Sequence, residues 1–123
     1  MRQRANIIRT LIYEPSVILM DEPFGPLDAQ TRLSLQALLL SIWETQRSTV
    51  LFVTHDLTEA IALADRVVLM SARPGRIVRA DRVDIPRPRD IFYMHDQPEF
   101  RRLYDALWNE LAAQLDGLGR NTH

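Results

Sequence analysis

The 123-residue chain contains no lysine, and all 15 of its basic residues are arginine. A phosphate-binding loop of the form GxxxxGK[ST] requires a lysine, so this sequence cannot form one. The chain also lacks cysteine, which excludes disulfide bonds and thiol chemistry and is compatible with a cytosolic location. No apolar stretch reaches the roughly 18 residues that a membrane-spanning helix needs.

Charge and apolar content are those of an ordinary globular protein. Apolar residues make up 46% of the chain and charged residues 25%, and the net charge is −1. This near-neutral charge gives no electrostatic reason to expect a nucleic-acid partner. The length is enough for one small domain with a modest core.

The most informative stretch is an apolar run that leads into two adjacent carboxylates. Residues 17–20 are apolar, and Asp21 and Glu22 follow directly. A short apolar run before a turn signal predicts a strand, at about 16–20, that is buried on both faces as in parallel sheets. Ligands of open α/β sheets bind at the carboxyl ends of the strands. We therefore expect a metal or phosphate site here, with a capped or salt-bridged pair as the alternative.

Helical and strand patterns alternate along the chain and predict an α/β fold with parallel strands. The expected helices cover about 1–12, 29–46, a segment from 57 onward, and 97–116. The further expected strands are 50–53, 67–70 and 77–83, the last two joined by a turn in an antiparallel hairpin. Two helices carry apolar stripes that we expect to face a core, namely Leu35, Leu38, Leu39, Ile42 and Trp43, and Phe100, Leu103, Tyr104, Leu107, Trp108, Leu111 and Leu115.

Polar residues also follow the second expected strand. His55 comes directly after the 50–53 run, so it shares a sheet edge with Asp21 and Glu22. A histidine there can bind a phosphate or a backbone carbonyl, and a purely structural role remains equally open. Asp56 and Glu59 have the spacing of a capping box. From its spacing alone, Asp28 is better interpreted as the N-cap of the next helix than as a functional residue.

Three motifs, in this order and spacing, resemble the second half of an ATP-binding cassette (ABC) transporter ATPase. Residues 20–23 resemble its Walker B motif, residues 27–28 its D-loop, and residues 54–56 its H-loop. Residues 1–4 resemble the tail of the family's signature motif. The resemblance covers residues 1 to about 112.

Two further stretches resemble one branch of that family. Residues 64–67 and 70–77 are most similar to the ATPases that serve nitrate, sulfonate and taurine importers. The resemblance implies a partial P-loop NTPase fold that uses ATP and Mg²⁺ on the cytoplasmic face of the inner membrane. It also implies a second ATPase subunit as homodimer partner, membrane permease subunits, and indirectly a periplasmic solute-binding protein.

The resemblance implies a role for each matching residue. Asp21 would hold Mg²⁺ through water, and Glu22 would be the catalytic base that polarises the attacking water. His55 would contact the γ-phosphate. Asp28 would bridge to the partner subunit across the nucleotide-sandwich dimer. Gln3 and Arg4 would belong to the helix behind the signature loop, with Gln3 as a nucleotide-binding residue.

Several parts of the family pattern are missing from this sequence. There is no Walker A loop, no Q-loop, and no Ser-Gly-Gly of the signature motif. We therefore expect the C-terminal part of a longer ATPase, beginning within the signature motif, that binds ATP poorly by itself. The alternative is a non-catalytic interaction or dimerisation module derived from such an ATPase.

The expected organisation has four parts. Residues 1–83 form the C-terminal half of the ATPase core. Residues 84–96, rich in proline and charge, form a surface linker. Residues 97–116 form an amphipathic helix, and residues 117–123, which contain two glycines, form a disordered tail.

Overall fold

The computed structural model describes residues 17–71 and 75–121, with side chains described up to residue 115. The expected helix over 1–12, with Gln3, and part of the expected turn before residue 77 lie outside these ranges. The chain divides into two compact units. The first runs up to His55 and includes Pro86–Met94, and the second combines Asp56–Ile85 with the chain from His95 onward.

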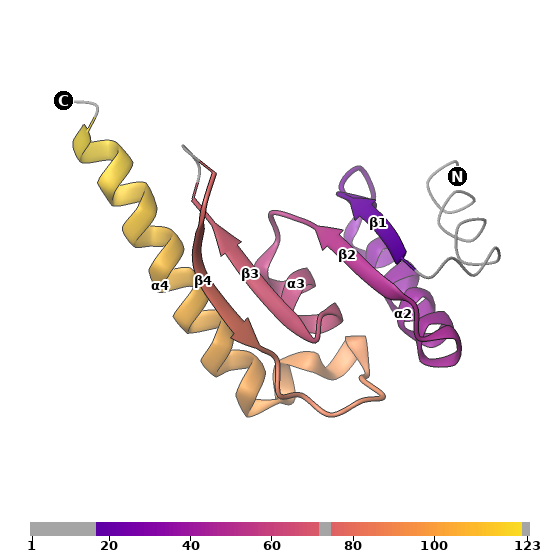
Figure 1. Ribbon diagram of the computed structural model, residues 1–123. Helices are drawn as coiled ribbons and strands as arrows, with labels where there is room; N and C mark the ends of the chain where they lie inside the picture. Colours follow the sequence, from indigo (N-terminus) through magenta and orange to yellow (C-terminus); the bar gives the residue numbers. More distant parts are fainter. Residues whose placement is uncertain (1–16, 72–74, 122–123) are drawn as a thin grey trace. The chain divides into compact units, whose positions relative to one another are not determined.

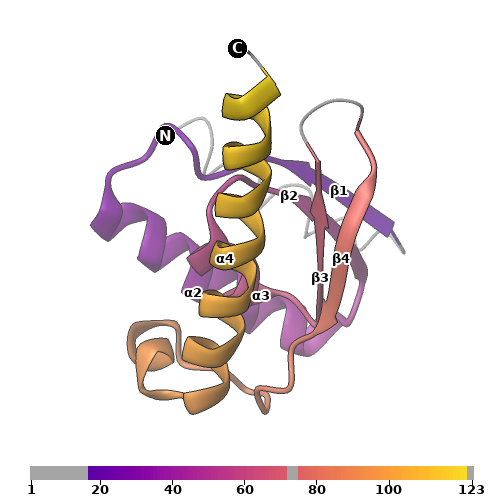
Figure 2. The same cartoon turned by 90° about the vertical axis from the view of Figure 1, so that its left-hand side faces the viewer.

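The first unit contains two parallel strands joined by a helix, which confirms the expected α/β arrangement. Strand β1, Val17–Asp21, pairs in parallel with β2, Thr49–Val53, so that Asp21 lies opposite Val53. Helix α2, Ala29–Gln46, makes the connection and lies beside the sheet (Figures 1 and 2). Parallel strands need such a crossover because the chain must return to the same end of the sheet.

The prediction that β1 is buried on both faces is wrong. Ile18 and Met20 are buried, whereas Val17 and Leu19 on the opposite face are exposed. Side chains alternate across a strand, so one layer of cover hides only every second residue. In the described part of the chain, β1 is covered on one face.

Helix α2 begins at the predicted residue and ends in a left-handed cap. Asp28 is its N-cap, and the side-chain oxygen Oδ2 accepts a hydrogen bond from the backbone N–H of Thr31 at 3.3 Å. Arg47, with φ of 58°, is its C-cap.

The expected apolar stripe of α2 is only partly right, because Leu38, Ile42 and Trp43 are half-buried. The fully buried side chains of α2 are Leu35, Gln36, Leu39 and Leu40.

Pro86–Met94 returns to the first unit and packs against the end of α2. The Arg87 guanidinium lies 4.3 Å from the centre of the Trp43 ring, and that of Arg47 lies 4.6 Å from it. Glu44 forms an ion pair with Arg47 at 2.9 Å. The segment expected as a surface linker therefore contacts the helix through a guanidinium that is largely buried.

The second unit contains the predicted antiparallel hairpin and two helices. Helix α3, Leu57–Leu63, is capped by Asp56, which accepts hydrogen bonds from the N–H groups of Thr58 and Glu59. Strand β3, Arg66–Met70, pairs with β4, Ile77–Arg82. Helices α3 and α4 lie on one face of this hairpin (Figures 1 and 2).

Helix α4, Pro98–Asn121, is longer than the sequence indicates. It continues through Gly117 and Gly119, where its end was expected, because a glycine weakens a helix by about 1 kcal/mol without blocking it. The 3-10 helix η1, Ile91–Asp96, precedes it. Of the predicted α4 stripe, Trp108 and Leu115 are exposed, and the fully buried members are Phe100, Leu103 and Leu107.

Candidate functional site

The carboxyl ends of β1 and β2 bring together two of the predicted site residues. His55 Nδ1 lies 2.7 Å from Glu22 Oε1, which is hydrogen-bond distance. The Glu22 side chain is 38% exposed and that of His55 83% exposed, so both remain accessible to a ligand. The arrangement joins a carboxylate to an imidazole at the edge of a parallel sheet, the place where α/β sheets bind ligands.

The backbone of Glu22 has an unusual conformation. Its φ of 50° lies in the left-handed region, which costs a residue with a side chain about 1–2 kcal/mol. The Glu22 N–H donates a hydrogen bond to the carbonyl of Val53 at 2.8 Å, and the Glu22 carbonyl accepts one from Gly25 at 3.3 Å. These bonds turn the chain sharply at the end of β1 and direct the carboxylate toward His55.

Asp28 lies at the far end of the same loop and caps α2. Hydrogen bonds from the side chain and the backbone N–H of Thr31 lower the pKa of the Asp28 carboxyl from its ordinary value. Its structural role as a cap, expected from spacing, is confirmed. The predicted bridge to a partner subunit is a separate role that stays a prediction.

Arg32 is a residue of this site that the sequence patterns did not indicate. Its Nη2 atom donates to two backbone carbonyls of the loop, those of Gly25 at 3.3 Å and Leu27 at 3.2 Å. The only available signal was its position one helical turn after the N-cap Asp28. Side-chain bonds to a loop backbone leave no trace in apolar periodicity, so this contact could not be read from the sequence.

Asp21 ends β1 with an exposed side chain, opposite Val53. Mg²⁺ is commonly held by one or two carboxylates together with waters and substrate phosphates, so a single accessible aspartate fits such an ion. Among the residues described, no group of three acidic, histidine or cysteine side chains could form a metal site without a substrate. Gln3, the other predicted nucleotide contact, lies outside the described residues.

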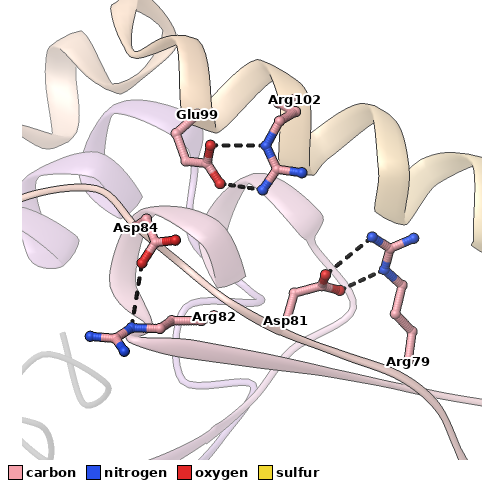
Figure 3. Close-up of polar contacts among 6 residues, drawn as sticks. All are labelled: Arg79, Asp81, Arg82, Asp84, Glu99 and Arg102. Atoms are coloured by element: carbon pink, nitrogen blue, oxygen red, sulfur yellow. Dashed lines mark hydrogen bonds and ion pairs between the residues drawn. The ribbon is translucent and has the colours of Figure 1, made fainter.

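The ion pairs of the second unit form local contacts within its strands and helices (Figure 3). Arg79 Nε lies 2.6 Å from Asp81 Oδ2 on β4, and Glu99 pairs with Arg102 on α4. The hydrogen bond from Arg102 lowers the pKa of Glu99, and the bond to Asp81 raises the pKa of Arg79. The partners of each pair are two or three residues apart in the sequence, so these pairs link neighbouring parts of one element.

Comparison with curated proteins identifies homologues of the chain. It is 56% identical over 90 residues to an uncharacterized ABC transporter ATP-binding protein of Methanocaldococcus jannaschii, a match covering 73% of this chain. The chain is a homologue of ABC transporter ATP-binding proteins. It is also 53% identical over 89 residues to an aliphatic sulfonates import ATP-binding protein of Bacillus cereus, over 72% of the chain. The predicted resemblance to ABC ATPases is thus confirmed.

The homologues are considerably longer than this chain. A Brucella melitensis protein named for ATP binding is 45% identical over 114 residues, or 93% of the chain. The matches span 34%, 36% and 48% of the lengths of the Methanocaldococcus, Bacillus and Brucella proteins, respectively. No protein-family model matches the chain. In residues 17–71 and 75–121, no helix has the length and apolar character to cross a membrane.

Proposed function

We propose that the chain forms part of an ATP-hydrolysing subunit of an ABC importer. The observation that carries this proposal is the 2.7 Å contact between Glu22 and His55 at the carboxyl ends of two parallel strands. ATP hydrolysis needs a base to orient the attacking water and a donor near the phosphate, and this pair supplies both types of group. The homology to ABC transporter ATP-binding proteins supports the same reaction.

The proposed roles follow from the accessibility of each group. Glu22 accepts the proton of the attacking water. His55 holds the carboxylate in place through Nδ1 and, when both ring nitrogens are protonated, donates to the γ-phosphate through Nε2. Asp21 holds Mg²⁺, which neutralises phosphate charge when it is bound. Asp28 contacts a second ATPase subunit while it caps α2.

The solute and partners are proposed from the relatives. One relative is named for the import of aliphatic sulfonates. We propose that this chain serves the import of a sulfonate, nitrate, taurine or similar small solute. It would act at the cytoplasmic face of the inner membrane, with permease subunits, a second copy of the ATPase subunit and a periplasmic binding protein.

The absence of lysine limits what the chain does alone. A Walker A loop holds the nucleotide phosphates with backbone N–H groups and a lysine, and this sequence cannot supply that lysine. We therefore expect the isolated chain to bind ATP weakly and to hydrolyse it too slowly to measure.

A second candidate is a non-catalytic interaction module. The exposed apolar face of the β1–β2 sheet favours it, because such faces commonly mark contacts with another protein. This candidate needs neither Asp21 nor the contact between Glu22 and His55.

The position at which a complex of a metal ion with ATP binds distinguishes the two candidates. Paramagnetic Mn²⁺ with ATP, added to the ¹⁵N-labelled chain, should broaden the amide signals of the non-proline residues in 21–28 and 54–55. Even weak binding produces this effect. Asp21→Asn should abolish the broadening, whereas Asp105→Asn, an exposed residue of α4, should leave it unchanged. Uniform broadening, or broadening that survives in the Asp21 variant, would favour the interaction module.

A further inference from the structure

We propose that Arg32 is a positioning residue for the pair formed by Glu22 and His55. This inference rests on the proposed function, because only that function makes the pair catalytic. Arg32 lies one helical turn inside α2. It acts on the loop of residues 22–28, which connects Glu22 to the start of the helix.

The contacts of Arg32 span this loop. A single guanidinium nitrogen, Nη2, donates to the carbonyls of Gly25 and Leu27. The Arg32 backbone N–H also donates to the carbonyl of Asp28 at 2.9 Å, within the first turn of α2. The arginine is therefore fixed to the helix at its backbone and to the loop at the end of its side chain.

The loop transmits this restraint to Glu22 through its own backbone bonds. The N–H of Gly25 donates to the carbonyl of Glu22, while the Gly25 carbonyl accepts from Arg32. In the same way, the N–H of Leu27 donates to Phe24, and the Leu27 carbonyl accepts from Arg32. The Arg32 side chain therefore binds the carbonyls of Gly25 and Leu27, the last residues of two overlapping turns.

The restraint matters because Glu22 has a disfavoured backbone conformation. A strained residue keeps its conformation only when the surrounding structure fixes it from several directions. Val53 fixes Glu22 from the sheet, and the loop held by Arg32 fixes it from the other side. Hydrogen bonds from a charged donor are stronger than neutral ones, which suits a guanidinium to this task. Without Arg32, the loop loses the two hydrogen bonds that join the Gly25 and Leu27 carbonyls to α2, and the Glu22 carboxylate can move away from His55.

The position of the proton on His55 reports this geometry without any nucleotide. When Glu22 accepts a hydrogen bond from Nδ1, neutral His55 carries its proton on Nδ1. The ¹⁵N chemical shifts of a labelled imidazole distinguish this form from the one protonated on Nε2. Glu22→Ala removes the acceptor and provides the reference spectrum for His55 in the absence of that carboxylate. His55→Gln identifies the His55 signals among those of the three histidines.

The test compares arginine variants of α2 in the full 123-residue chain, at a pH where histidine is neutral. Arg32→Gln should move the His55 shifts most of the way toward those of Glu22→Ala. Arg32→Lys, which retains a charged donor, should give a smaller displacement in the same direction. Arg47→Gln removes an arginine from the other end of α2 and should leave the His55 shifts at their wild-type values.

The proposal is overturned if Arg32→Gln is folded and its His55 shifts match those of the wild type. It is equally overturned if Arg47→Gln displaces them as far as Arg32→Gln does. Should far-UV circular dichroism show that Arg32→Gln is unfolded, Arg32→Lys decides: displaced His55 shifts support the proposal, and wild-type shifts reject it. The readout needs no nucleotide, so failure of the Mn²⁺–ATP experiment would reject the proposed function and leave this result unaffected.

Discussion

At the scale of single residues, the site depends on a glutamate whose left-handed backbone conformation is unfavourable for a residue with a side chain. Glu22 adopts a left-handed backbone angle, and three contacts hold it there. The contacts come from Val53 of β2, from Gly25 of the loop, and from the His55 side chain. Strained residues persist where the surrounding structure fixes them, and they concentrate at functional sites.

The charge of Asp28 should make stability depend on pH. Hydrogen bonds from the side chain and the backbone N–H of Thr31 lower the pKa of Asp28 in the folded chain below its ordinary value of 3.8. A carboxyl with a lowered folded pKa stabilises the protein above its unfolded pKa, and this contribution disappears as the pH falls through the folded pKa. Asp28→Asn retains a capping oxygen but removes the charge. We expect it to lower the free energy of unfolding at neutral pH and to have less effect in acid.

Urea unfolding followed by circular dichroism, at about pH 7 and about pH 3, measures this difference. Asp105→Asn serves as the control, since this exposed aspartate lies on α4 and caps no helix. A destabilisation by Asp28→Asn that stayed the same at both pH values would show that the charge of Asp28 is not responsible.

The sequence indicated which residues meet at the site but not how they are held. Glu22 and His55 were expected together because each follows an apolar run, and parallel strands end at one edge. Asp28 was recognised from the preference of aspartate for N-caps. The left-handed angle of Glu22 and the bonds of Arg32 depend on the tertiary path of the loop, which no local pattern encodes.

At the scale of helices and strands, the positions of elements were easier to predict than the faces they bury. Strand β1 and helix α2 match their predicted ranges within one residue. The buried face of α2 includes Gln36 and Leu40, neither of which belonged to the expected stripe. Burial depends on which neighbours surround a helix, and an apolar residue such as Leu38 remains half-buried if no neighbour covers it.

The exposed face of the β1–β2 sheet should cause the chain to self-associate. Four apolar side chains on this face are between 45% and 68% exposed, namely Val17, Leu19, Leu51 and Val53. Exposed apolar faces and unpaired strand edges promote aggregation. The double substitution Leu19→Thr with Leu51→Thr removes apolar surface while keeping residues that suit strands. We expect this variant to remain monomeric at protein concentrations where the wild-type chain associates.

Sedimentation velocity over a range of concentrations measures the effect. The matched control is Val68→Thr with Met70→Thr, which alters exposed apolar residues of β3 in the second unit. Equal suppression of association by the control would mean that general surface hydrophobicity, and not this sheet face, drives it. Unchanged association of the Leu19 and Leu51 variant would contradict the prediction directly.

At the scale of the whole molecule, the chain corresponds to between 34% and 48% of the length of its relatives. The 114 residues matched to the Brucella melitensis protein include the carboxylates and the histidine at the strand ends. The lysine of a phosphate-binding loop is absent from the chain. If the proposed function is correct, the shared part supplies the groups that activate water, and phosphate binding must come from elsewhere.

This division of roles can be tested by joining the shared part to a complete relative. In the Brucella melitensis protein named for ATP binding, the matching 114 residues would be replaced by those of this chain. We expect the chimera to hydrolyse ATP, because the relative supplies the phosphate-binding part, while the isolated chain shows no measurable hydrolysis. Glu22→Gln in the chimera should lower kcat by about 10²–10⁴-fold, the contribution of a general base. Glu44→Gln, which alters a glutamate of α2 away from the strand ends, should leave kcat unchanged.

If the chimera hydrolysed ATP equally well with and without the Glu22→Gln substitution, Glu22 would not be the base. Hydrolysis by the isolated chain, lost on Glu22→Gln, would show instead that this chain binds phosphate without a lysine.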